Sequence, residues 1–371
     1  MKRALATLID AKRLVVFVGE GGVGKTSCAA ATAIAAARSG RRVAVLTVDP
    51  APRLGDALGL DGIDDEPRTV DLDTDSGSLV AMRLDTKRTF DRVVESLAPG
   101  DDIAARILEN PIYQTIAGTL GGSDSYMAFQ RLYELVETDD YDLVVIDTPP
   151  TAHAEDLLAA PARLASLIES GAPAVLADPA IMIARAGSKL ARAGLTVVLG
   201  VLERVTGSEL RTQVAEFIGG FEGVLDGLRV RAAEVDAMLK RDGTSFVQIV
   251  RPSADGVTPA LGFRRYLIEQ GLPLEAVVVN RLTPGVGEER KVPLEERLRD
   301  APPGTLAAVA SIERDLDGLR RDEAGAVDDL EAGIAADSPE PACTVVRTRS
   351  LEHDVTGVEE LLELAELLGL A

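Results

Sequence analysis

Residues 19–26 have the residue types and the spacing of a phosphate-binding loop. They read Gly-Glu-Gly-Gly-Val-Gly-Lys-Thr, with a short apolar run before them and an alanine-rich stretch after them. Glycines allow successive backbone N–H groups to turn inward around phosphate oxygens, and a helix that begins at the loop adds the positive end of its dipole. A strand before the loop and a helix after it are the context that this motif requires. The segment therefore predicts a nucleoside triphosphate as ligand.

Each position of the loop has an expected task. The Lys25 ammonium would neutralise the β- and γ-phosphate oxygens, and the Thr26 hydroxyl would bind Mg²⁺. Backbone N–H groups would supply the remaining phosphate contacts. The expected nucleotide-binding residues of this segment are Gly21, Gly22, Val23, Gly24, Lys25, Thr26 and Ser27.

Two further apolar runs end in aspartate. Asp147 follows Leu-Val-Val-Ile, and Asp49 follows Val-Ala-Val-Leu-Thr-Val. Hydrolysis of a nucleoside triphosphate needs a carboxylate for the magnesium shell and a group that orients the attacking water. We assign Mg²⁺ to Asp147, directly or through water, and the attacking water to Asp49. The alternative for both residues, and the preferred reading for Asp56, is an ordinary turn or surface aspartate.

Residues outside the phosphate loop indicate which nucleotide base could be recognised. Guanine recognition typically uses an Asn/Thr-Lys-x-Asp element, and residues 86–89 lack its aspartate. Asn280, at the end of Val-Val-Val-Asn, has an amide that can bond to a base edge. The sequence therefore favours ATP over GTP.

Apolar runs typical of buried parallel strands alternate with helical patterns. The runs lie at residues 13–18, 43–48, 79–84, 141–146, 245–250, 276–279 and 344–348. This alternation predicts an α/β fold, a P-loop NTPase with a mostly parallel central sheet flanked by helices. Asp85 is placed to cap one of the helices.

The domain organisation follows from where strands are missing. Residues 1–150 would form the first part of an ATPase core, 151–243 an inserted helical subdomain, and 244–371 the second part of the core. Within the last part, the charged segment 284–340, which contains Pro and Gly, is expected to be partly mobile.

Composition excludes several classes of protein. The formal net charge of −21 disfavours nucleic acid and anionic lipid as main partners. Two cysteines, Cys28 and Cys343, and two histidines, His153 and His353, are too few for a disulfide framework or a zinc site. Cys28 is expected to be a small core residue. No leader or membrane-spanning run is recognisable, so the expected location is cytoplasmic.

The motifs taken together resemble the arsenite-pump and guided-entry (tail-anchored protein targeting) ATPase family. The resemblance is carried, in family order, by GEGGVGKTS (19–27), DPAPRLGDALG (49–59), LDTKRTFD (84–91), DTPPTAH (147–153) and VVVNRL (277–282). It implies a Mg²⁺-dependent ATPase with a deviant Walker-A loop that couples nucleotide state to handling of a client or a pump.

The resemblance also implies residue roles. Asp49 would orient or activate the hydrolytic water in a first switch, with Lys25 on the phosphates. Asp147 would open a second switch that runs to His153, for which an ordinary loop histidine is the alternative. Asn280 would contact adenine, and residues 349–353 fall where the family has an adenine-flanking loop.

The sequence departs from the family pattern in three places. Glu20 stands where the family has a signature lysine that reaches the partner's phosphates, and a carboxylate there would repel them. This puts the usual dimer in question and leaves a homodimer and a heterodimer with a paralogue both open, with Arg53 as one candidate replacement cation. The Cys-x-x-Cys pair that holds zinc between subunits and the cysteine triad that binds metalloid are both absent.

Residues 172–206 are rich in Ala, Val, Leu and Ile. Either this insertion packs on itself, or it presents an apolar groove to a membrane-protein client. For the whole chain, the main alternative to an ATPase is an ATP-binding regulatory scaffold with little turnover, which Glu20 favours. A partition-type ATPase and a small-molecule kinase are weaker alternatives.

Overall fold

The computed structural model describes most of the chain. It covers residues 4–74, 76–111, 113–114, 123–150, 155, 158–160, 223–284, 296, 299, 301–302, 304–337 and 343–370. His153 and residues 172–206, with the expected client groove, lie outside this description.

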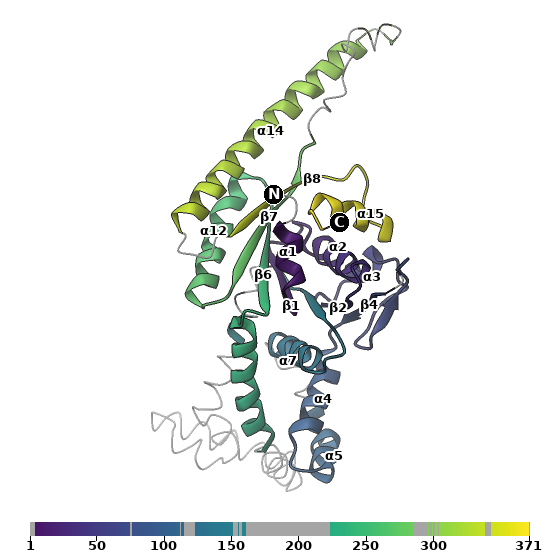
Figure 1. Cartoon of the computed structure of the whole chain (residues 1–371), viewed down its shortest axis with the longest axis vertical. Helices are drawn as coiled ribbons and strands as arrows, with labels where there is room; N and C mark the ends of the chain where they lie inside the picture. Colours follow the sequence, from purple (N-terminus) through teal and green to yellow (C-terminus); the bar gives the residue numbers. More distant parts are fainter. Residues whose placement is uncertain are drawn as a thin grey trace, which may run out of the picture. The chain divides into compact units, whose positions relative to one another are not determined.

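The core is one sheet of eight strands in the order β3-β4-β2-β5-β1-β6-β7-β8 (Figure 1). The strands are β1 (Leu14–Gly19), β2 (Arg42–Thr47), β3 (Arg68–Val70), β4 (Ser78–Arg83), β5 (Leu143–Asp147), β6 (Thr244–Val250), β7 (Leu274–Leu282) and β8 (Thr344–Arg349). All neighbours pair in parallel except β3, which is antiparallel to β4. The expected α/β fold with a mostly parallel sheet is confirmed. The carboxyl ends of the parallel strands therefore gather at one edge of the sheet.

The central strands are apolar because both of their faces are covered. Every residue of β1, β5 and β6 is buried. On one face, alternate strand residues such as Val15, Val45 and Val247 share a core with α2 (Lys25–Arg38) and α15 (Val358–Leu367). The many alanines of α2 leave room for α15 and the sheet to pack closely against it.

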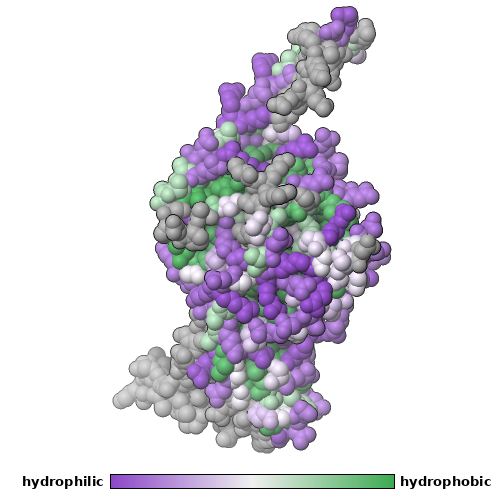
Figure 2. Space-filling view, in the orientation of Figure 1, coloured by the Kyte–Doolittle hydropathy of each residue, from purple (hydrophilic) through white to green (hydrophobic). Residues whose placement is uncertain are grey.

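A second layer lies on the opposite face. Gln248, which alternates with Val247 in β6, donates from Nε2 to the Ala260 carbonyl of α12 (Ala254–Glu269) at 2.9 Å. Helix α14 (Thr305–Ala336) packs against α12 and β7. It is a single helix of 32 residues within the segment expected to be partly mobile. Figure 2 shows mostly hydrophilic side chains on the visible surface of α14.

The described chain divides into two compact units. One contains residues 1–83, 135–155 and 240–371, and the other contains residues 84–134 and 156–239. The second unit thus includes residues 84–134 as well as most of the segment 151–243 that the sequence suggested as an insertion. Its core joins Phe90, Tyr113 and Tyr126 with Val224 and Leu228.

Further helices are α1 (Ala4–Asp10), α3 (Arg53–Ala57), α4 (Thr86–Leu97), α5 (Asp101–Glu109) and α7 (Ser123–Glu137). The Asp85 side chain accepts from the Arg88 N–H at 2.9 Å, so the expected cap of α4 is confirmed. In the described part of the chain, none of the helices combines the length and the apolar character needed to cross a bilayer.

Candidate nucleotide-binding site

The phosphate loop connects β1 to α2, as the motif requires. Gly22 and Gly24 have φ values of +76° and +98°, which residues with a side chain rarely adopt. Helix α2 begins at Lys25, directly after Gly24. Gly21 and Gly22 are exposed, Val23 is buried, and Thr26 and Ser27 are half-buried. The loop thus presents its backbone at a helix N-terminus, where phosphate groups are bound favourably.

Lys25 is held over the loop by the loop itself. Its Nζ donates to the Glu20 carbonyl oxygen at 2.8 Å, and the residue is only 7% exposed. Burial lowers the pKa of Lys25, whereas the nearby carboxylates of Asp147 and Asp49 raise it. Lys25, Asp147 and Asp49 therefore interact electrostatically, as a site for phosphate and a cation requires.

Asp147 lies at the end of β5 and is bound by two hydroxyl groups. Its Oδ2 accepts from Thr26 Oγ1 at 2.7 Å and from Thr47 Oγ1 at 3.1 Å. Its Oδ1 is buried with no hydrogen-bond partner among the described residues. Burial raises the pKa of this carboxyl to about 6, although both hydroxyls and Lys25 act in the opposite direction.

The Thr26–Asp147 pair fits a magnesium ion. The Asp147 Oδ1, which is unpaired among the described side chains and backbone groups, and the adjacent Thr26 hydroxyl are hard oxygen ligands, which Mg²⁺ prefers together with nucleotide phosphates and water. When bound there, the ion would neutralise phosphate charge. Thr47, which the sequence analysis missed, supplies the second hydroxyl to Asp147; the only signal was a polar residue inside an apolar run.

Asp49 sits in a turn after β2. Its Oδ1 accepts from the Ala51 N–H at 2.9 Å, and its Oδ2 lies 3.3 Å from Nη1 of Arg53. The Arg53 side chain is 64% exposed, and in this structure it pairs with Asp49. Asp49 therefore does form a turn, which the sequence offered as the alternative to a catalytic role. In this turn its carboxylate still interacts electrostatically with Lys25. Asp56 is exposed on α3.

Asn280 reaches the phosphate loop from β7. Its Nδ2 donates to the Val23 carbonyl at 2.9 Å, and its Oδ1 accepts from Thr348 Oγ1 at 2.8 Å and from the Arg281 N–H at 3.0 Å. The residue is 5% exposed. One amide hydrogen remains for a base edge, so the adenine contact stays a prediction. No local pattern in the sequence indicates that Asn280 also bonds to the phosphate loop.

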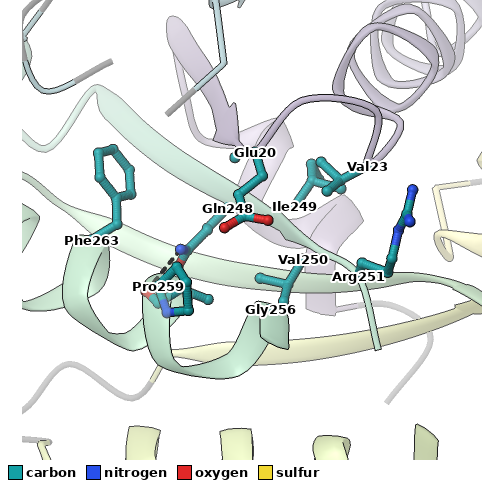
Figure 3. A pocket seen from close by; sticks show the side chains of 11 residues that line it. Glu20, Val23, Gln248, Ile249, Val250, Arg251, Gly256, Pro259 and Phe263 are labelled. Carbon is teal, nitrogen blue, oxygen red and sulfur yellow. Dashed lines mark hydrogen bonds between the residues drawn. The ribbon is translucent and has the colours of Figure 1, made fainter. Parts of the chain in front are cut away.

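Glu20 is the second residue of the loop and lines a small cleft. Figure 3 shows its side chain extending toward Gln248 of β6 and Pro259 of α12, which line this cleft. Cys28, in the first turns of α2, is fully buried, and burial raises the pKa of its thiol to about 12. The expectation that Cys28 is a core residue is confirmed.

Residues 12–179 match the family model described as anion-transporting ATPase. This part of the chain matches the ATPase family. The chain is similar to the ATPase ARSA2 of Chlamydomonas reinhardtii, with 31% identity over 254 residues that cover 67% of this chain and 62% of that protein. It is also similar to the ATPase get3 of Aspergillus terreus, with 34% identity over 167 residues that cover 44% of this chain and 48% of the relative. The chain thus spans less than two thirds of the length of these relatives.

The match of residues 12–179 to the anion-transporting ATPase family, together with these relatives, confirms the resemblance that the motifs carried. The family model begins before the phosphate loop and extends beyond β5, so it includes Lys25, Asp49 and Asp147. Asn280 and β8 lie outside that match. What the structure shows for Asn280 and β8 is that β7, which contains Asn280, lies next to β8 in the sheet.

Proposed function

We propose that this chain is a Mg²⁺-dependent ATPase of the arsenite-pump and guided-entry type. In this proposal, ATP binds at residues 21–27 and Mg²⁺ at Thr26 and Asp147. Asp49 orients the attacking water and Lys25 stabilises the phosphate charge. The observation that carries the proposal is the bond between Thr26 and the buried Asp147 carboxylate, whose Oδ1 has no hydrogen-bond partner in the part of the chain that the structure describes.

Hydrolysis would be coupled to movement of the loops that follow β2 and β5. These loops contain Asp49 and residues 148–150, which lie directly after two site strands. A change at the γ-phosphate would therefore alter contacts in both loops. We propose that this movement serves a client protein or a membrane partner, without nucleic acid or zinc, and that the chain acts in the cytoplasm.

A second candidate function is an ATP-binding regulatory scaffold with little turnover. It is favoured by Glu20, because a carboxylate in this position cannot supply the positive charge that the family's lysine gives to a partner's phosphates. The same observation leaves a homodimer and a heterodimer with a paralogue as open assemblies.

Steady-state hydrolysis of Mg²⁺-ATP separates these functions. We expect turnover by the wild-type chain and a loss of at least about 100-fold in Lys25→Ala, because charge stabilisation at the phosphates is removed. Asp49→Asn should lose hydrolysis and retain ATP binding, because its role is in the attack by water. Lys87→Ala, which removes a lysine from α4, serves as the control.

Each result has a defined meaning. Wild-type turnover above about 1 s⁻¹ would exclude the scaffold, since that is an ordinary enzymatic rate. Tight ATP binding with no turnover above the Lys25→Ala background would favour the scaffold. Full activity in Asp49→Asn would overturn the role assigned to Asp49.

A further inference from the structure

Two consecutive residues of β7 bond to the phosphate loop from the same side. Asn280 Nδ2 donates to the Val23 carbonyl at 2.9 Å, and Arg281 Nη1 donates to the Gly22 carbonyl at 3.0 Å. These are bonds to carbonyl oxygens, whereas phosphate is bound by the N–H groups of such a loop. The two side chains can therefore fix the loop without competing with the nucleotide for donors.

The backbone of β7 is distorted where these residues lie. In a regular strand, consecutive side chains point to opposite faces, so two neighbours would not both reach one loop. Here the pairing of β7 with β8 shifts between Val279 and Leu282, and Arg281 has a φ of +67°. A left-handed conformation is unfavourable for arginine and persists only where surrounding contacts impose it. The distortion turns Arg281 toward the loop beside Asn280.

Strand β8 supports the arrangement. Thr348 Oγ1 donates to Asn280 Oδ1 at 2.8 Å, and the Ser350 N–H donates to the Leu282 carbonyl at 2.8 Å. Thr348 and Asn280 are both buried, whereas Arg281 is exposed. Asn280 is thus a buried anchor for the loop, and Arg281 carries a positive charge at the solvent side of the loop.

We propose that Asn280 and Arg281 form a clamp that holds the phosphate loop in its nucleotide-binding conformation. Thr348 orients Asn280, and Arg281 adds positive charge in cis to a loop that carries the Glu20 carboxylate. Both are positioning residues. The proposal rests on the proposed function in that the ligand of the loop is ATP.

The left-handed backbone at Arg281 makes a sharp test available. Arg281→Gly removes the guanidinium and at the same time suits a φ of +67°, so the variant should unfold at the same urea concentration as the wild-type chain or at a higher one. We expect its affinity for ATP to fall roughly tenfold, since a charge-assisted hydrogen bond to the loop is lost. Arg281→Lys keeps the charge and one donor, and should recover part of the affinity.

Thr348→Val tests the anchor without removing Asn280. The valine keeps the shape of threonine but no longer orients the amide, so we expect ATP binding several-fold weaker than in the wild-type chain. Arg265→Ala, which removes an exposed arginine of α12 that pairs with Asp337, is the matched control and should bind ATP normally. Affinity is measured by calorimetry with ATP and Mg²⁺.

Hydrogen exchange of the loop amides, followed without nucleotide, provides a second measurement. Residues 19–26 should exchange faster in Arg281→Gly and Thr348→Val than in the wild-type chain, while the rest of α2 is unchanged. Wild-type affinity and wild-type exchange in both variants would overturn the clamp. If the wild-type chain bound no ATP, the proposed function would fail, and the exchange data would still decide whether the clamp exists.

Discussion

The charge of Asp147 is the residue-scale feature on which magnesium binding depends. The residue is 1% exposed, and burial raises its pKa from 3.8 to about 6. Because the folded-state pKa lies above the unfolded one, the contribution of this carboxyl to stability is fully present below pH 3.8 and is lost as the pH rises through about 6. At neutral pH the ionised carboxylate costs the metal-free fold up to about 3 kcal/mol.

Asp147→Asn should therefore stabilise the metal-free protein at pH 7.5, by about 1–3 kcal/mol. The asparagine stays neutral, so the difference should shrink as the pH falls toward 4. Urea unfolding over this pH range without Mg²⁺ measures it. Asp142→Asn is a control that should change stability in the opposite direction and destabilise the protein at pH 7.5, because hydrogen bonds from Arg42 hold the pKa of Asp142 at about 2. Equal pH dependence in Asp147→Asn and the wild-type chain would contradict the prediction.

Asp147→Asn should also lose magnesium-dependent hydrolysis of ATP. In the wild-type chain, hydrolysis should decrease as the pH falls through about 6, because protons then compete with Mg²⁺ for the carboxylate. The measurement is the rate as a function of Mg²⁺ concentration at pH 5.5 and pH 7.5. A magnesium dependence that does not change between these conditions would argue against Asp147 as a ligand.

At the scale of elements, the position of the phosphate loop depends on α2, the helix that it opens. The helix is fixed between the sheet and α15, whose Leu361 and Leu364 are buried in the same core as the α2 alanines. The alanines provide little side-chain area of their own. Much of the apolar contact on this side of α2 is therefore provided by α15.

Leu364→Ala should destabilise the protein by about 2–5 kcal/mol, the usual range for a buried leucine that leaves a cavity. Leu364 is not one of the proposed nucleotide-binding residues, so the ATP affinity of the folded fraction should be nearly unchanged. Urea unfolding and calorimetry with ATP provide the two values. Glu366→Ala, an exposed change on the same helix, should stay within about 0.5 kcal/mol of the wild-type chain.

At the scale of the whole molecule, acidic residues dominate. The chain has 60 Asp and Glu residues against 39 Lys and Arg residues, and hydrophilic side chains cover much of the face in Figure 2. Several exposed arginines, among them Arg53, Arg265 and Arg347, pair with a carboxylate. A positive surface for a polyanion is therefore not expected.

We predict that the protein does not sediment with phosphatidylserine vesicles and does not retard duplex DNA, even at 20 mM salt, where electrostatic attraction is strongest (the Debye length is then about 20 Å). Vesicles of phosphatidylcholine separate apolar from electrostatic binding. Salt-sensitive binding to either anionic surface would instead favour the partition-type ATPase.

The sequence by itself determined those parts of the site that are local in the chain. The strand, loop and helix around residues 19–26 follow from glycine spacing and from apolar periodicity, and Asp49 and Asp147 follow from their places after apolar runs. These features need only neighbours within a few residues. The same patterns predicted the α/β class and the cap of α4 at Asp85.

Only the tertiary structure decided which distant residues share the site. The contacts of Thr47 with Asp147 and of Asn280 with Val23 join residues 100 and 257 positions apart. They depend on the strand order, which places β5 between β1 and β2 and sets β8 beside β7. Local patterns do not encode that order or a distorted backbone at Arg281, because strand pairing and the bonds that compensate strain form only when the whole sheet is assembled.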